Sequence, residues 1–210
     1  MTPESLAGLS FAPDTFDRLL PAPPALAQDS RGSAEHPQRS LTIAWEDPLA
    51  TVARAHALTG VEYLRALADG DLPAPPISLL LGFELEEVDE GRVVFGAHPG
   101  EHHYNPIGLV HGGLASTLLD SALGCAIHST LSRGATYSTV ELKVNFIRPI
   151  TRDTGRVRCE GIVVHRGAKI ATAEGRVVAE RTGKLLAHGT TTCLVSEPVA
   201  GAVTPLLAAA

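Results

Sequence analysis

The feature that most constrains the fold is a long apolar stretch near the middle of the chain. From Gly113 to about Leu131, apolar residues recur at helical spacing and cover a broad face. Stretches rich in β-branched residues come before and after it, so the helix can bury this face against a sheet. The pattern predicts an α+β fold in which a sheet wraps one long central helix. The apolar positions are Leu114, Ala115, Leu118, Leu119, Ala122, Leu123, Ala126 and Ile127.

Turn residues divide the sequence around this helix into strands. Glu90-Gly91, Arg166-Gly167 and Thr182-Gly183 are typical of tight turns between them. From Ile77 onward, after the chain break at Gly70–Pro76, we expect strand before the helix. The expected strands are Phe83–Asp89, Arg92–His98, Thr136–Pro149, Arg156–Arg166, Ala168–Arg181 and Lys184–Val195.

The sequence before residue 76 differs in composition from the rest. Residues 1–46 are rich in Pro, Ala, Ser and Asp over most of their length, so we expect a flexible N-terminal segment. Residues 47–69 have helical spacing, with Asp47 as N-cap, Pro48 in the first turn and a break at Gly60. We therefore expect a helical extension and linker at 47–75, one domain at 76–196, and a C-terminal tail at 197–210.

Composition excludes several classes of protein. The net charge of −6 disfavours a nucleic-acid partner. The N-terminus has no secretory pattern and no stretch is apolar enough for a membrane span, so we expect a cytoplasmic protein. Cys125, Cys159 and Cys193 are far apart and include no Cys-x-x-Cys, so we expect small buried thiols.

The run from Asn105 to Asp120 carries the chemistry. His111, Gly112 and Gly113 stand at the start of the predicted helix, where backbone N–H groups lack intrahelical partners. Glycine lets another group approach that backbone closely, so a carbonyl oxygen could be polarised there. The amide of Asn105 can hold a water molecule or a carbonyl, and His111 can orient the substrate or fix the turn.

Asp120 is the candidate base. It lies eight residues after Gly112 on the predicted helix, beside small polar neighbours on a mostly apolar surface. A carboxylate in such a partly dry place is a better base than one in bulk water. Two helical turns separate it from the glycine pair, too far for one to serve the other readily.

This run resembles the PaaI-type hotdog-fold acyl-CoA thioesterases of the 4-hydroxybenzoyl-CoA thioesterase superfamily. The resemblance covers about residues 76–196 and implies a hotdog fold, with an antiparallel sheet around the central helix. It implies that His111 helps hold the thioester and that Asn105 positions the nucleophilic water. Asp120 would activate this water or attack directly, from the subunit opposite the Gly112-Gly113 turn. Similar proteins often place a hydroxyl near the water, and Thr139 matches that position.

The resemblance therefore implies hydrolysis of an acyl-CoA at a dimer interface, in a homodimer or a tetramer of two dimers. No cofactor is expected, because CoA is part of the substrate. For its binding we select Gly113, Arg166 and Lys169, the last two forming a cationic turn. His102 and His103 adjoin the run, but no carboxylate or cysteine completes a metal-ligand spacing.

Two other functions stay open. A hotdog hydratase or dehydratase would have an Asp two residues before the Asn-Pro run, where this chain has His103. A non-catalytic acyl-CoA-binding or regulatory protein would not need a helix carboxylate beside the thioester. A serine nucleophile is disfavoured, because Ser116 and Ser138 lack the Gly-x-Ser-x-Gly pattern.

Overall fold

The computed structural model describes residues 38–55 and 57–197. The chain divides into two units, Met1–Leu41 and Thr42–Ala210. Of the first unit only residues 38–41 are described, and they form neither helix nor strand. The predictions for residues 1–46 and 197–210 therefore lie almost entirely outside the described part. All of the described helices and strands belong to the second unit.

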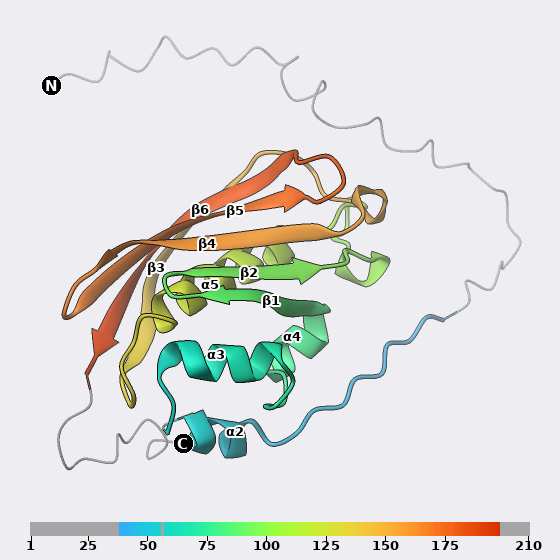
Figure 1. The fold of residues 1–210 in the computed structure, drawn as a ribbon. Coiled ribbons are helices and arrows are strands. Elements are labelled where there is room, and N and C mark those ends of the chain that lie inside the picture. Colours follow the sequence, from blue (N-terminus) through green and yellow to red (C-terminus); the bar gives the residue numbers. More distant parts are fainter. Residues whose placement is uncertain (1–37, 56, 198–210) are drawn as a thin grey trace, which may run out of the picture. The chain divides into compact units, whose positions relative to one another are not determined.

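The second unit is built on one antiparallel sheet of six strands, curled around a long helix (Figure 1). The strand order is β1-β2-β4-β5-β6-β3, so β3 pairs with the last strand of the chain and forms one edge. This is the arrangement expected of a hotdog fold. The strands are β1 (Phe83–Asp89), β2 (Arg92–Ala97), β3 (Thr136–Phe146), β4 (Val157–Arg166), β5 (Ile170–Ala179) and β6 (Leu185–Ser196).

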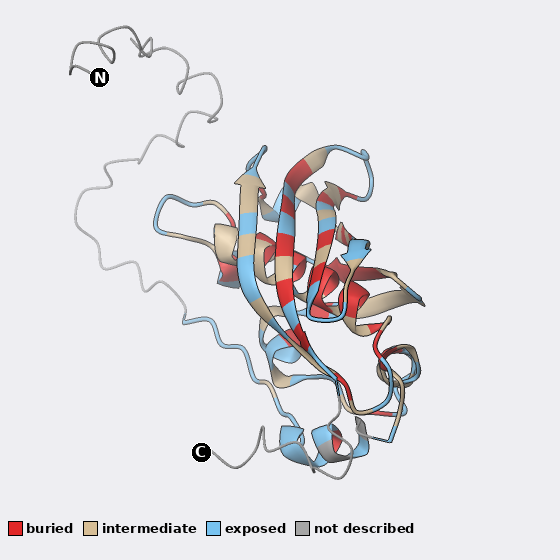
Figure 2. Cartoon of the chain, turned by 90° about the vertical axis from the view of Figure 1, so that its left-hand side faces the viewer, coloured by how far each residue is buried: buried red, intermediate tan, exposed pale blue. Residues whose placement is uncertain are grey.

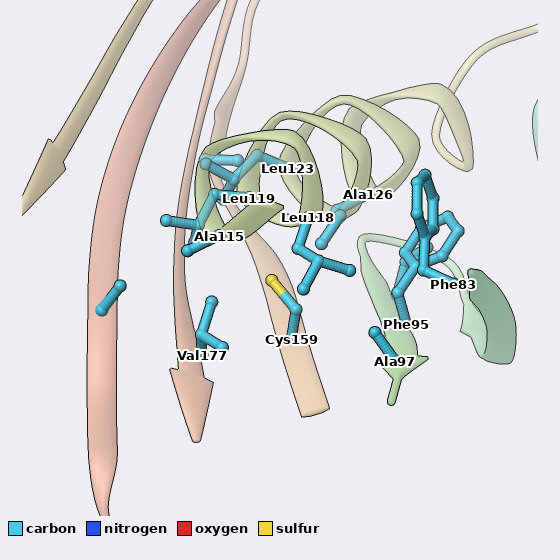
Figure 3. Close-up of a cluster of buried hydrophobic side chains, with 14 of the residues drawn as sticks. Phe83, Phe95, Ala97, Ala115, Leu118, Leu119, Leu123, Ala126, Cys159 and Val177 are labelled. Carbon is cyan, nitrogen blue, oxygen red and sulfur yellow. The ribbon is translucent and has the colours of Figure 1, made fainter. Parts of the chain in front are cut away.

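The central helix α5 (Gly112–His128) supplies the middle of the core. Its leucines and alanines pack against inward-facing residues such as Cys159 and Val177 (Figure 3). Along the strands buried and exposed residues alternate, because only one face of the sheet meets the helix (Figure 2). The predicted end at Leu131 is three residues too late, since the Ser129 hydroxyl donates to Ala126 O at 2.7 Å where the helix ends.

Glycines in the strands let the sheet curl closely around α5. A Cβ on Gly161 of β4 would lie 2.4 Å from Ala122 O, and one on Gly175 of β5 would lie 2.9 Å from a methyl of Leu123. Any larger residue would push the strands off the helix. The tight curl therefore depends on positions that the strand pattern alone did not single out.

Three short helices precede the sheet: α2 (Pro48–Ala55), α3 (Gly60–Ala68) and α4 (Pro76–Leu81). Asp47 caps α2 through a 2.9 Å bond from Leu49 N, as predicted. The expected break at Gly60 is confirmed, with Thr59 and Glu62 forming a capping box at the start of α3.

Helix α4 corrects the expectation of a strand from Ile77. Pro76 occupies the first helical turn, and Gly82 ends the helix with a φ of 62° in the left-handed region. The apolar run at 77–81 is short enough to suit either state, so the flanking proline and glycine decide it.

Ion pairs cross the outer face of the sheet from β1 to β5. At one point the side chain of Glu86 on β1 lies over Gly96 of β2 and meets the guanidinium of Arg156, just before β4, at 2.5 Å. A Cβ on Gly96 would fall 1.6 Å from the Glu86 carboxylate, so a larger residue there would displace the tip of the Glu86 side chain. The network also contains Glu84, Glu87, Asp89, Arg92, Arg158, Glu160, Arg176 and Glu180.

Candidate active site

The turn before α5 is organised by the side chain of Asn105. Its Oδ1 accepts hydrogen bonds from the backbone N–H groups of Ile107 and Leu109, each at 3.1 Å. This is the local bonding by which Asn favours turns. Both hydrogen bonds to this oxygen therefore come from within the turn. The side-chain Nδ2 has no acceptor among the described residues, so it is the part of Asn105 that a ligand can use.

His111 is the N-cap of α5. Its Nδ1 accepts a hydrogen bond from Gly113 N at 2.8 Å, which makes the uncharged ring with its proton on Nε2 the form that caps the helix. A Cβ on Gly113 would lie 2.8 Å from that same Nδ1, so glycine is needed for the ring to approach. The geometry supports the turn-fixing part of the prediction for His111.

Gly112 offers the free donor at the start of α5. Within the described part of the chain, nothing accepts a hydrogen bond from its N–H, whereas His111 takes the N–H of Gly113. A Cβ on Gly112 would lie 3.0 Å from the ring of Phe146, at the end of β3. The helix start therefore presents one unpaired N–H beside an aromatic ring, which suits a developing oxyanion.

Asp120 and Thr139 form the second part of the predicted site. The Thr139 hydroxyl donates to Asp120 Oδ1 at 3.0 Å, which holds the carboxylate in one orientation. The side chain of Asp120 is exposed in the single chain. The dry surroundings expected for this residue are thus not provided by its own chain.

The two parts of the site lie apart on α5. Eight residues of helix between Gly112 and Asp120 correspond to about 12 Å at 1.5 Å per residue. Asp120 and Thr139 line a cavity, while no residue of the Asn105–Gly113 turn does. One chain therefore brings Asp120 together with Thr139 and Gly112 together with His111, but does not join the two pairs.

The cavity beside Asp120 has a volume of about 740 Å³ and is mainly apolar. This size lies within the usual range of small-molecule sites. One wall is Asp120, Ser121 and Cys125 of α5 with Tyr137 and Thr139 of β3. Residues of α3, α4, β1 and β2 form the others.

Comparison with known proteins assigns the family. Residues 107–186 match the family described as the thioesterase superfamily. The chain is 31% identical over 99 residues to acyl-coenzyme A thioesterase 13 of Homo sapiens, covering 47% of this chain and 69% of that relative. The chain belongs to the thioesterase superfamily. The predicted class, a thioester hydrolase with a hotdog fold, is confirmed at this level. This thioesterase spans about two thirds of the length of its curated relatives.

Solved structures of the superfamily share the fold of this thioesterase. A thioesterase family protein from Silicibacter pomeroyi is 28% identical, with a TM-score of 0.58 over 64% of this chain and 99% of that one. A mutant of the phenylacetic acid degradation protein PaaI from Thermus thermophilus is also 28% identical, with a TM-score of 0.51 over 57% of this chain and 98% of that one. The resemblance to PaaI-type proteins is confirmed.

The cations selected for CoA differ in availability. Arg166 of this thioesterase pairs with Glu197 at 2.7 Å and donates to the carbonyl of Gly167. The ion pair with Arg166 and a hydrogen bond from the Ser132 hydroxyl hold the pKa of Glu197 below its usual range. An anion at Arg166 would have to displace Glu197, whereas the side chain of Lys169 has no ion pair among the described residues. Gly113, the third residue selected for CoA, is not a cation, and its N–H is already bonded to His111 Nδ1.

His103 has a structural role that the sequence did not reveal. It is buried, with Nδ1 accepting from Gly100 N and Nε2 bonded to Leu81 O at the end of α4, both at 3.0 Å. Its own carbonyl accepts from His111 N at 2.7 Å. Burial lowers the pKa of His103, which keeps the ring uncharged. One residue thus ties α4 to the N-cap of α5.

Two further residues of the cavity wall, Cys125 and Tyr137, remain uncharged. Burial raises the pKa of the Cys125 thiol to about 12 and that of the Tyr137 hydroxyl well above its usual value. The ring of Tyr137 packs on α5 where a Cβ at Gly124 would lie 2.9 Å away. Burial also raises the pKa of Cys159 and Cys193, so none of the cysteines is a thiolate nucleophile near neutral pH.

Two other kinds of feature are absent from the described residues. None of the helices described in this thioesterase has the length and apolar character needed to cross a membrane. Across residues 38–197, apart from His56, no three His, Cys, Asp or Glu side chains gather where they could hold a metal ion.

Proposed function

We propose that this chain hydrolyses an acyl-CoA thioester to a carboxylic acid and CoA, with Asp120 assisting the attack of water. The observation that carries the proposal is the Asp120–Thr139 hydrogen bond at the wall of an apolar cavity. A carboxylate at such a position can take a proton beside a bound acyl group. The name of the human relative, acyl-coenzyme A thioesterase 13, agrees with a CoA thioester as substrate.

The chemistry follows from the free groups of the site. Asp120 accepts a proton from water while the water oxygen forms a bond to the thioester carbonyl carbon. The C–S bond then breaks, and the proton passes to the CoA thiolate. Thr139 holds one carboxylate oxygen, and the unpaired Gly112 N–H stabilises the oxyanion. Asn105 Nδ2 is available to hold the acyl carbonyl or an attacking water through a hydrogen bond.

The site is completed by a second copy of the chain. Within one chain Gly112 and Asp120 are separated along α5, so we assign the oxyanion donor to the partner subunit. The edge strand β3 supports this assembly, because among the described strands it pairs only with β6. Val140 and Phe146 on it are each 59% exposed. An unpaired edge with apolar side chains favours pairing with another strand. The assembly is a dimer or a tetramer of two dimers.

The CoA portion of the substrate lies outside the apolar cavity. We assign its phosphates to Lys169 and Arg166, with Arg166 exchanging Glu197 for a phosphate. The Gly113 backbone, which has no side chain, lets the thioester end approach α5. No cofactor takes part in this proposal.

The structure gives no support to the hydratase alternative. In that reaction a carboxylate would stand at position 103, where this chain has a buried histidine bonded to Leu81 and Gly100. A binding protein without activity would not need the free Gly112 N–H. Loss of absorbance from crotonyl-CoA would reveal hydration, and binding without thiol release would reveal a non-catalytic role.

The test is the variant Asp120→Asn, assayed by release of free CoA thiol. We expect kcat to fall by about 10²–10⁴-fold, the usual contribution of a general base. KM should change little, because the amide fills the same space. The control is Asp153→Asn, an exposed aspartate with only a long ion pair to Arg152, which should keep wild-type turnover.

Unchanged turnover in Asp120→Asn would contradict the mechanism. Single turnover in ¹⁸O-labelled water tests for direct attack. Label in Asp120 after one turnover of excess enzyme would show a covalent acyl intermediate opened at the aspartyl carbon, whereas general-base catalysis predicts label in the product only.

A further inference from the structure

The cavity beside Asp120 is walled largely by segments that precede the family match. Helices α3 and α4 lie before residue 107, where that match begins, yet residues of both line the cavity. We propose that α4 sets the acyl-chain preference of the enzyme, with Leu79 as a specificity-determining residue. The inference rests on the proposed function, because it assigns the cavity to the acyl group of the thioester.

Helix α4 lies at an open side of the cavity. Ile77 and Leu79 line it, although they are 47% and 37% exposed, respectively. Apolar side chains that face both a cavity and solvent mark an opening, which a bound alkyl chain would cover. Leu80, on the same helix and 47% exposed, does not line the cavity. The helix therefore carries a leucine at the cavity next to one outside it.

Helix α4 is anchored at its C-terminal end, where His103 Nε2 is bonded to Leu81 O at 3.0 Å. Its first turn is stabilised from within, because the Ser78 hydroxyl donates to Pro75 O at 2.7 Å. Gly82 turns the chain directly into β1. The end of α4 that carries Leu79 is therefore tied to the turn before α5 and to β1, which suits a residue that selects for chain length.

The opposite wall suits an apolar chain. From Asp120 to Cys125 the cavity follows α5 for about 7.5 Å, given 1.5 Å per residue. Beyond the carboxylate this wall ends in the protonated groups of Cys125 and Tyr137. A cavity of about 740 Å³ leaves most of its volume empty around a two-carbon acyl group. The geometry thus favours an extended alkanoyl chain of medium or greater length.

The test compares Leu79→Trp with Leu80→Trp in the full-length protein. Hydrolysis is followed by free thiol from butanoyl-CoA and dodecanoyl-CoA. Leu79→Trp should lower the dodecanoyl-to-butanoyl ratio of kcat/KM by about tenfold or more, since a few methylenes in an apolar site give such factors. Leu80→Trp should keep the wild-type ratio. Leu79→Ala introduces no added bulk that could disturb folding. It should raise kcat/KM for acyl chains longer than the wild-type optimum, relative to butanoyl-CoA.

A binding measurement separates this inference from the proposed function. Calorimetry with the thioethers dodecyl-CoA and butyl-CoA needs no turnover. Selective loss of dodecyl-CoA affinity in Leu79→Trp supports the role of α4 even if the wild type releases no thiol, an outcome that would overturn only the hydrolysis. Equal losses for both thioethers, or the same shift in Leu80→Trp, would overturn the role of α4.

Discussion

At the scale of single residues, His111 acts through its position at the start of α5. Its Nδ1 accepts the Gly113 N–H, and the Cβ-free Gly113 makes room for the ring. The ring accepts the Gly113 N–H and not the Gly112 N–H, so among the described residues Gly112 keeps an unpaired donor. The histidine therefore directs which amide is available to substrate.

Replacement by another capping residue tests this role. Asparagine is among the best N-caps, so His111→Asn should keep activity within a few fold. His111→Ala should lose about 1 kcal/mol of stability, the usual cost of an absent cap. The measurements are kcat with the preferred acyl-CoA and the urea midpoint. A collapse of kcat in His111→Asn at unchanged stability would instead assign proton transfer to the imidazole.

At the scale of elements, His128 joins α5 to α3 and β3. Its ring lies between those of Tyr63 and Tyr137, each centroid 5.4 Å away. Burial lowers the pKa of His128 to about 4 from the usual 6.5. The uncharged ring is thus part of the contact among three elements next to the cavity.

Acid should weaken this contact. Because the folded pKa is depressed, the stabilisation is complete above pH 6.5 and is lost as the pH falls toward 4. The loss is on the order of 3 kcal/mol at 1.36 kcal/mol per pKa unit. Urea midpoints of the wild type should fall over this range, and those of His128→Phe should fall less.

A control variant and the lower pH range of the carboxylates separate the contribution of His128 from those of other groups. His188→Phe, at an exposed position of β6, should retain the wild-type pH dependence. The ion-paired carboxylates Glu87 and Glu160 have pKa values lowered below 4.5, so their contribution is lost only at lower pH. Parallel curves for wild type and His128→Phe between pH 6.5 and 4 would contradict the role of His128.

The sequence predicted these elements where local signals are strong. Turn glycines placed the strand ends, and the periodicity from Leu114 to Ile127 gave the central helix. Helix α4 was missed because a short apolar run fits strand and helix equally. The pairing of β3 with β6 joins residues such as Thr136 and Ser196, and no local pattern encodes so distant a partner.

The candidate site was likewise predictable only in part, where local sequence determines the contact. The cap by His111 agrees with the turn-fixing role expected of it at the start of the helix. Thr139 was selected only through the family resemblance, as a hydroxyl near the water, and its hydrogen bond to Asp120 joins β3 to α5 across the fold. Phe146 meets Gly112 only through the fold, and Leu79 reaches the cavity from an element outside the motif. Such contacts depend on how the sheet curls, which the strand pattern does not specify.

At the scale of the whole molecule, activity depends on two chains if the oxyanion donor and the base come from different subunits. Gly112→Pro removes the N–H while proline still suits the first helical position. Asp120→Asn removes the base. Each variant alone should be inactive, because every site in its homodimer has one defect.

Mixing the two chains should restore activity. Random reassembly from denaturant gives half heterodimers, and each has one intact site of two, so about a quarter of wild-type turnover should return. As a control, the two variants are refolded separately and then combined under conditions in which their subunits do not exchange. No recovery after reassembly would place both halves of the site in one chain, contrary to the proposal.

The side chain of Glu86 over Gly96 has a consequence for how this protein can change over time. A methyl group at 96 would displace the tips of both Glu86 and Arg156, so alanine there would disturb their ion pair. Loss of the Glu86 carboxylate removes the nearest of these contacts and leaves alanine at 96 with less to displace. The same two substitutions are therefore easier to accept in one order than in the other, with residue 86 changing first. The missing methyl group at 96 thereby gives the history of this part of the sheet a preferred direction.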